Sequence, residues 1–308
     1  MNQSIKCFVA AVAISLSGSL VSACGGDSSD AEGKGEGNAK LSLASVRGSW
    51  QEAKVLRQAE EQLMTQCMKA KGQKYIASPI PDSEPKWDSF GRWNTVEPGD
   101  DVQRARRTGY NFQDFQARQK STPPDLNGAY LKTLSPTEQQ KWDLAIKGDK
   151  TVKVSVPGSG EGERPAGGCY GDIQKQLYGD LNKWYQAQGT IDMLAGPVGA
   201  LVAQDQQTRR VEDDWPKCMA TKGYRYKHPR DAQSEGFKLA ERGSKDKEIK
   251  LAVAAAECDK QVGFTSTMRN VWDSHQAKVI ADREGQIIAY RTLRMEALKR
   301  AHSVLRNS

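Results

Sequence analysis

Apolar residues recur every three or four positions along most of the chain after residue 41, with charged and amide side chains between them. Before and around Cys67 the apolar positions are Val55, Leu56, Ala59, Leu63, Cys67 and Ala70. This spacing is typical of an amphipathic helix that buries one face. Similar spacing from Ile173 to Trp184 and from Ile249 to Ala256 predicts a mainly helical fold with little or no β structure.

The longest apolar stripe follows the cap residues Thr265 to Thr267. It runs through Met268, Val271, Trp272, Val279, Ile287, Ile288, Leu293, Leu298 and Leu305. If unbroken, this C-terminal helix has about 38 residues and is about 57 Å long. Such a helix exceeds what one compact core needs, so we expect it to brace two units or to protrude. Basic residues at its far end favour a solvated or partner-facing tip: Arg291, Arg294, Lys299, Arg300 and Arg306.

Shorter signals lie in the middle of the chain. Ser135-Pro136-Thr137-Glu138 combines an N-cap serine, a proline at the first helical position and a glutamate three residues after the cap, which predicts a helix start. Residues Thr151 to Val156 alternate as a single short strand does, and the Gly-rich segment from Pro157 to Gly168 is expected to be a loop. Its spacing, its acidic residues and the lack of a Gly-Lys-Ser ending argue against a phosphate-binding loop.

One nine-residue pattern occurs twice. Residues 67–75 (CMKAKGQKY) and 218–226 (CMATKGYRY) both read C-M-x-x-K-G-x-K/R-Y. In each copy the lysine suits the end of a helix and the following glycine supplies a left-handed cap. Each copy is followed by one further cysteine, Cys169 or Cys258. The sequence therefore predicts two divergent helical units, residues 41–207 with a long aromatic loop and residues 208–308 with the C-terminal helix.

The N-terminal segment has the features of a secretory signal. A positive start at Lys6 precedes an apolar run from Phe8 to Leu20 that is too short for a spanning helix. Val21-Ser22-Ala23-Cys24 resembles the lipobox of bacterial lipoproteins, which implies cleavage after residue 23 and diacylation of Cys24. Residues 24–40 contain almost nothing apolar, so we expect a lipidated, flexible tether at the outer face of the cell membrane.

The number of cysteines that remain after processing predicts two disulfides. Cys7 leaves with the signal and Cys24 carries lipid, so an even number of cysteines remains in an extracytoplasmic protein: Cys67, Cys169, Cys218 and Cys258. Three connectivities are possible. The duplication favours equivalent pairing within each unit, which joins Cys67 to Cys169 and Cys218 to Cys258.

The segment between Tyr75 and Leu134 is rich in proline and aromatic residues. Its rings and its arginines form either a ligand-binding surface or a set of anchors that pin a long loop to the helices. The candidate binding residues are Trp87, Phe90, Trp93, Arg104 and Tyr110.

The sequence lacks the motifs of common catalytic sites. It has no serine nucleophile elbow, metalloprotease motif or dinucleotide fingerprint, and its 3 histidines are scattered, so we expect neither a metal nor a cofactor. The neighbouring carboxylates Asp100-Asp101 and Asp213-Asp214 diverge on a helix or loop and are interpreted as solvated charge. A formal net charge of +7 suits anionic wall polymers or lipid headgroups as partners, or serves solubility alone, and the compartment excludes nucleic acid.

The lipobox, the paired helix-end motifs and the long C-terminal helix together resemble uncharacterised lipoproteins of Gram-positive, high-GC bacteria of actinobacterial type. That resemblance implies a location at the cell membrane but no activity. The sequence favours a lipid-anchored, noncatalytic binding or scaffold module that engages envelope components or another envelope protein. The alternative is an envelope hydrolase whose two carboxylates lie far apart in the chain.

Overall fold

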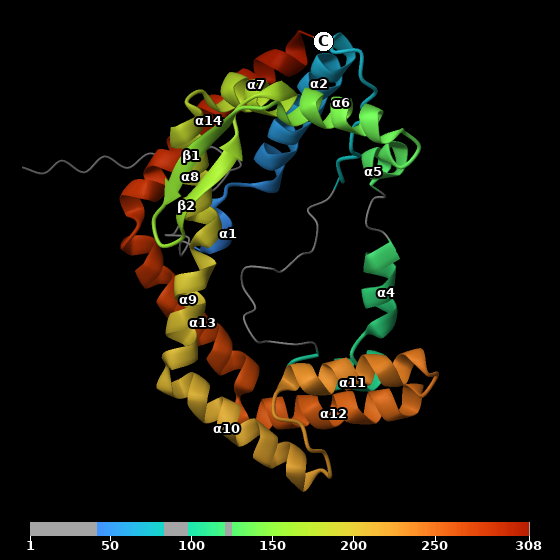
Figure 1. Cartoon of the computed structure of the whole chain (residues 1–308). Helices are drawn as coiled ribbons and strands as arrows, with labels where there is room; N and C mark the ends of the chain where they lie inside the picture. The colour runs from blue at the N-terminus through green and yellow to red at the C-terminus, as the bar shows by residue number, and fades with distance from the viewer. Residues whose placement is uncertain (1–41, 83–97, 121–124, 308) are drawn as a thin grey trace, which may run out of the picture. The chain divides into compact units, whose positions relative to one another are not determined.

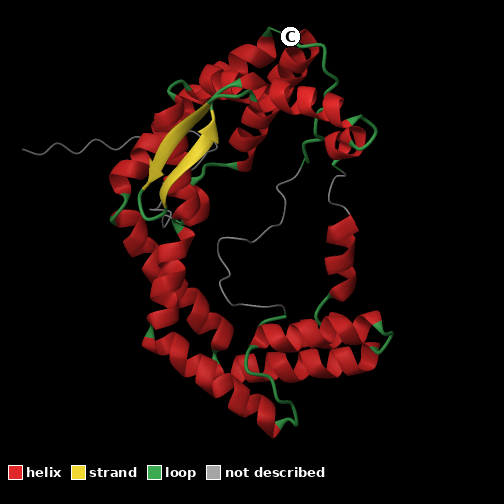
Figure 2. Ribbon diagram, in the orientation of Figure 1, coloured by secondary structure: helices red, strands yellow, loops and turns green. Residues whose placement is uncertain are grey.

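A computed structural model describes residues 42–82, 98–120 and 125–307 (Figure 1). The predicted signal segment, Cys24 and the predicted tether therefore lie outside the described residues. The helices are α1 (Leu43–Val46), α2 (Trp50–Ala70), α3 (Val102–Thr108), α4 (Phe112–Lys120), α5 (Leu126–Leu131), α6 (Pro136–Lys147), α7 (Gly168–Tyr178), α8 (Leu181–Met193), α9 (Ala195–Gln204), α10 (Gln206–Thr221), α11 (Pro229–Glu241), α12 (Lys245–Val262), α13 (Phe264–Ala281) and α14 (Glu284–Arg306). The mainly helical fold is confirmed (Figure 2).

The two copies of the repeated motif end helices in the same way. Gly72 follows α2 with φ 68°, and the N–H of Gln73 donates to the carbonyl of Met68 at 2.9 Å. Gly223 follows α10 with φ 84°, and the N–H of Tyr224 donates to the carbonyl of Met219 at 3.0 Å. These bonds satisfy carbonyls that a helix end would otherwise leave open, and the glycines take the left-handed conformation without a Cβ clash.

Both disulfides join a motif helix to the helix that its unit supplies later in the chain. Cys67 of α2 is bonded to Cys169 of α7, and Cys218 of α10 is bonded to Cys258 of α12. The Cα atoms lie 5.7 Å and 5.6 Å apart. The pairing within each unit is thus confirmed among the connectivities that the sequence left open.

The expected Gly-rich loop is in part a second strand. β1 (Thr151–Val156) pairs antiparallel with β2 (Gly160–Pro165), with Thr151 opposite Pro165 and Val156 opposite Gly160. Apolar alternation predicts only β1, because β2 packs no side chain into the core and is exposed along most of its length. Gly189 of α8 allows β1 to approach, since a Cβ at that position would lie 2.6 Å from a methyl group of Val156.

The C-terminal stripe forms two helices instead of one unbroken helix. α13 ends at Ala281, and α14 begins at Glu284. The two helices serve different parts of the core, because α13 packs on α9 and α10 whereas α14 packs on α2, α7 and α8. The side chains of Ala297 and Ala301 on α14 have no exposed surface, so α14 packs on α2, α7 and α8 and does not protrude along that part. Contacts therefore cross the boundary expected between residues 207 and 208.

A buried carboxylate lies where α2 meets α7. The Oε1 atom of Glu60 accepts hydrogen bonds from the Tyr178 hydroxyl at 2.9 Å and from Gln174 Nε2 at 3.2 Å. Gln174 in turn accepts from Trp184 Nε1 at 2.8 Å, and the Trp184 ring stacks on Tyr178. Burial raises the pKa of Glu60, and these hydrogen bonds only partly offset that effect.

The variant Glu60→Gln is expected to be about 1 kcal/mol more stable than wild type at neutral pH. Both donors contact the same oxygen, so an amide carbonyl can accept both bonds without a buried charge. Because the folded pKa of Glu60 is raised, its neutral form contributes stability at low pH, and that contribution is lost as pH rises through the folded pKa. The advantage of the variant should therefore shrink on acidification, which urea unfolding at several pH values measures. An advantage that does not change with pH would contradict this account.

Candidate functional site

Residues 98–117 contain α3, which packs on α12, and the start of α4, whose rings contact α11. At the end of α3, Gly109 has φ 59°, and the next backbone N–H, that of Tyr110, donates to the Glu248 carboxylate. The Glu248 side chain is buried, and burial raises its pKa. Gly99, before α3, lies against Thr265 at the start of α13, so the segment is held at both ends of its path over α12.

The described aromatic residues of this segment are anchors. Tyr110, predicted to belong to a binding surface, is only 2% exposed, and its ring packs so closely on Gly236 of α11 that a Cβ there would lie 2.2 Å away. Phe115 stacks on Phe237 of α11 at a centroid distance of 4.7 Å, and Phe112 lies tilted against the same ring at 5.3 Å. These rings pin the segment to the helices because they bury apolar surface there.

Of the other residues predicted to form the binding surface, the structure describes only Arg104. Arg104 is partly buried on α3, next to the groove described below. Trp87, Phe90 and Trp93 lie outside the described residues, so their part in a binding surface stays a prediction.

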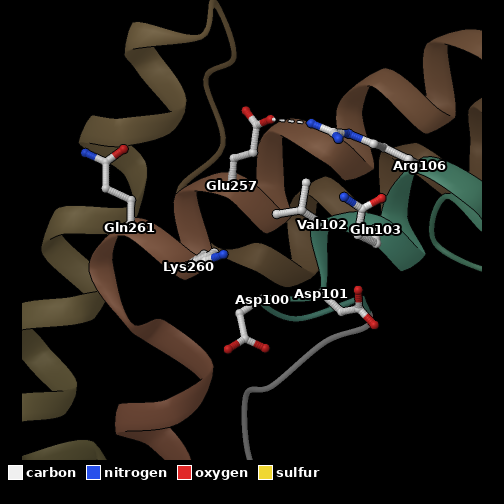
Figure 3. A pocket seen from close by; sticks show the side chains of 8 residues that line it. All are labelled: Asp100, Asp101, Val102, Gln103, Arg106, Glu257, Lys260 and Gln261. Atoms are coloured by element: carbon white, nitrogen blue, oxygen red, sulfur yellow. Dashed lines mark ion pairs between the residues drawn. The ribbon is translucent and has the colours of Figure 1, made fainter.

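A polar groove runs between the start of α3 and the last turns of α12 (Figure 3). Its cavity has a volume of about 550 Å³. The lining combines carboxylates, cations and amides from both elements: Asp100, Asp101, Val102, Gln103, Arg106, Glu257, Lys260 and Gln261. Residues more than 150 positions apart in the chain thus form one site, and this follows from the packing of α3 on α12.

Most of the groove carboxylates already have partners. Glu257 Oε2 lies 2.7 Å from Lys222 Nζ, and its Oε1 lies 3.8 Å from Arg106 Nη2. Asp101 caps α3, accepting the N–H of Arg104 at 2.9 Å. The carboxylates are thus used to fix the walls of the groove.

A further carboxylate on α12, that of Asp259, does not line the groove and is buried. It accepts the N–H of Thr265 at 2.9 Å and the Thr265 hydroxyl at 2.6 Å, which joins α12 to the start of α13. Burial raises the pKa of Asp259, and the negative charge of Asp100 raises it further. Its hydrogen bonds assign Asp259 a structural role.

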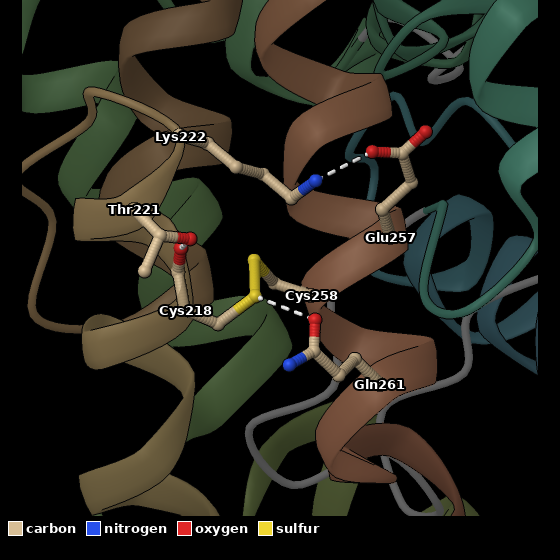
Figure 4. The surroundings of a disulfide bond; sticks show 6 residues. All are labelled: Cys218, Thr221, Lys222, Glu257, Cys258 and Gln261. Atoms are coloured by element: carbon tan, nitrogen blue, oxygen red, sulfur yellow. Dashed lines mark hydrogen bonds and ion pairs between the residues drawn. A yellow bond between two sulfur atoms is a disulfide. The ribbon is translucent and has the colours of Figure 1, made fainter.

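The second disulfide supports the α12 wall (Figure 4). Gln261 Oε1 lies 3.4 Å from Cys218 Sγ, and Glu257, the neighbour of Cys258, pairs with Lys222 just after α10. The disulfide and this ion pair hold α10 and α12 together at the position where α12 lines the groove. The α12 wall of the groove is therefore crosslinked to α10.

The groove presents hydrogen-bond donors and acceptors, and its lining includes both positively and negatively charged groups. Such a surface suits a polar ligand that carries both charges, whereas the acid and base of a hydrolase need two carboxylates free to reach a scissile bond. Asp100 and Asp101 do not form such a pair, because Asp101 caps a helix. Among the described residues, no three histidine, cysteine or acidic side chains gather as metal ligands.

Sequence reasoning missed the α12 half of the groove. Glu257, Lys260 and Gln261 surround Cys258 at helical spacing, so one face of α12 carries them all. That spacing is a signal, but only the packing of α3 indicates that the face is a groove wall.

Comparison of the chain with protein-family models, with curated proteins and with solved structures finds no match. None of the helices in the described part of the chain combines the length and the apolar character that crossing a bilayer requires.

Proposed function

We propose that this chain is a lipid-anchored protein at the outer face of the cell membrane, and that its folded part binds another envelope component without catalysis. The anchoring part rests on the signal-like N-terminus and on Val21 to Cys24. Two disulfides between helices suit an oxidising compartment outside the cytoplasm.

The polar groove between α3 and α12 is the observation that carries the binding function. Arg106 and Lys260 offer cationic donors, Asp100 offers an acceptor, and Gln103 and Gln261 offer amides. An extended peptide of another envelope protein has the matching groups, because its backbone and its charged side chains present donors and acceptors in turn. A groove whose α12 wall is crosslinked to α10 binds such a segment at a reduced entropic cost on the protein side.

A photoreactive residue introduced at Gln103, on the exposed groove wall, should form a discrete covalent adduct in intact envelopes. The matched position is Lys153, an exposed residue of β1, which should yield none. The double variant Arg106→Gln, Lys260→Gln should lower the adduct yield roughly five-fold or more, since two charged contacts are removed.

Two other results would contradict the proposal. Equal adducts at Gln103 and Lys153 would indicate nonspecific contact, and an adduct that is insensitive to the double variant would place the ligand elsewhere. In the same cells, Cys24→Ala should abolish labelling by a fatty-acid analogue and release the protein from the membrane fraction. A labelled, membrane-bound Cys24→Ala protein would contradict lipid attachment at that residue.

A further inference from the structure

A second cavity lies where the α1–α2 connection meets α14. Its volume is about 420 Å³. It is lined by the end of α1, the connection, the first turn of α2 and one face of α14: Ser45, Val46, Gly48, Ser49, Glu52, Arg291, Arg294 and Met295. Two arginines from one helix face therefore enter a single small cavity.

The side chain of Arg294 is largely buried, and one of its hydrogen-bond donors has no acceptor among the described residues. Its side chain is 12% exposed, and its Nε atom is buried without a hydrogen-bond partner in the described part of the chain. The nearest carboxylate oxygen, Glu52 Oε2, lies 3.8 Å from that nitrogen, beyond hydrogen-bond distance. Burial raises the pKa of Tyr290, and the Arg294 guanidinium, which bonds to the Tyr290 hydroxyl, offsets only part of that effect.

Gly48 allows the Glu52 carboxylate and the Arg294 guanidinium to pack closely against the backbone of the α1–α2 connection. It has φ 90°, and a Cβ there would lie 2.9 Å from Arg294 Nε and 2.3 Å from Glu52 Oε2. The guanidinium of Arg294 faces Glu52 and bonds to Tyr290, but its buried Nε–H has no acceptor among the described residues. An unsatisfied buried donor is costly, so its position beside the cavity points to a ligand that supplies an acceptor.

The charges of the cavity favour an anion. Arg291 is exposed beside Arg294, and the positive end of the 21-residue helix α2 adds to both. The single opposing charge, Glu52, is engaged in a capping box, where its Oε2 accepts the N–H of Ser49 at 2.9 Å. Two guanidinium groups with fork-shaped donors match the oxygens of a phosphate.

The surroundings of the cavity indicate where that phosphate comes from. Met295 is 52% exposed and Ile288 is 57% exposed, and their seven-residue separation places both on the face of α14 that also carries Arg291. Exposed apolar side chains beside arginines are typical of a surface that contacts a bilayer. In addition, α1 is the first helix after residues 24–40, and the N–H of Leu43 fixes its start by donating to Gln276 at 3.2 Å.

We propose that this cavity binds the phosphate of an anionic lipid headgroup, with Arg291 and Arg294 as its ligands and with Ile288 and Met295 against the bilayer. The inference rests on the proposed envelope location and names the lipid class that the folded part contacts. It concerns a surface separate from the polar groove.

The test uses the unlipidated chain from Lys40 onward, because residues 40–308 form a compact unit that contains the described core and both disulfides. It should sediment with vesicles of phosphatidylcholine and phosphatidylglycerol, and not with phosphatidylcholine alone. Arg291→Gln should weaken this binding roughly five-fold. The matched control Arg209→Gln removes the same charge from an exposed site on α10 and should change binding less than about two-fold.

Glu52→Gln provides a test in the opposite direction. Glutamine at this position preserves the capping box, so the fold is retained while the opposing charge is removed. Vesicle binding should become tighter, whereas Glu241→Gln, at an exposed site on α11, should leave it unchanged. Equal effects of Arg291→Gln and Arg209→Gln, or no binding to anionic vesicles, would overturn the proposal.

Two further experiments distinguish this lipid site from a wall-polymer site and from the polar groove. Binding to soluble poly(glycerol phosphate) without binding to vesicles would overturn the lipid assignment in favour of a wall polymer. Lys260→Gln in the polar groove should leave vesicle binding unchanged, so loss of the groove adduct and loss of vesicle binding are independent results. If Cys24 proved unmodified while vesicle binding was observed, the proposal of a lipid anchor would be withdrawn and the proposal of the phosphate site would be retained.

Discussion

Replacing both Cys67 and Cys169 with alanine is expected to lower the free energy of unfolding by about 4.7 kcal/mol. Their bond closes a loop with a sequence separation of 102 residues, and without it the unfolded chain gains the corresponding conformational freedom. For Cys218 and Cys258, separated by 40 residues, the expected loss is about 4 kcal/mol. The two losses are similar because loop-closure entropy grows only with the logarithm of loop length.

Urea unfolding of the two double variants and of wild type, followed by circular dichroism, measures both losses. Losses of this size are a large fraction of the stability of an ordinary domain, so partial unfolding at 37 °C is expected for either variant. Wild type treated with a reductant serves as the control, because it loses the same crosslinks without a change in side-chain volume. A loss below about 1 kcal/mol for either pair would show that helix packing alone holds those helices together.

Gly109→Ala is expected to release residues 98–117 from α12, at a cost of roughly 3 kcal/mol or more. A Cβ at this position would lie 2.1 Å from an oxygen of Glu248, and φ 59° is unfavourable for alanine. The carboxylate of Glu248 would then be buried without the N–H of Tyr110 that it now accepts. Hydrogen exchange should report lost protection in residues 98–117 and along the facing side of α12.

Gly158→Ala is a matched control, since Gly158 also has a positive φ, 85°, but a Cβ there meets nothing within 4 Å. Its effect should be limited to backbone strain of about 1 kcal/mol in the turn between β1 and β2. Tyr110→Phe separates the ring from its hydroxyl. That hydroxyl has no hydrogen-bond partner among the described residues, so this variant should keep the segment docked. Protection of residues 98–117 in Gly109→Ala equal to that in Gly158→Ala would contradict the role assigned to Gly109.

The docking of this segment also bears on function. The start of α3 supplies one wall of the polar groove, and α12 supplies the other. Gly109→Ala should therefore lose the adduct at Gln103 as well, although Gly109 does not line the groove. The proposed binding by the groove would in this way depend on the anchoring of the segment through one glycine and one buried carboxylate.

Local chemistry made several features predictable from the sequence. Gly72 and Gly223 end their helices as expected, because only the nearest few residues decide a helix cap. Ser135 and Glu138 likewise form the expected capping box at the start of α6. The duplicated motif favoured the observed pairing of cysteines, and the mainly helical fold followed from apolar spacing.

Contacts between distant residues decided the rest. The bond between Tyr110 and Glu248 joins positions 138 residues apart, and no local pattern marks Gly109 or Gly236 as sites of close approach. The break after Ala281 exists because α13 and α14 pack on different helices, while the apolar stripe continues through both. The groove and the arginine cavity each combine short polar segments whose meeting depends on how helices pack. The sequence alone determined the mainly helical character and the helix caps at Gly72, Gly223 and Ser135, since these depend on neighbouring residues. Only the tertiary structure decided where α13 ends, which cysteines pair and which side chains share a site.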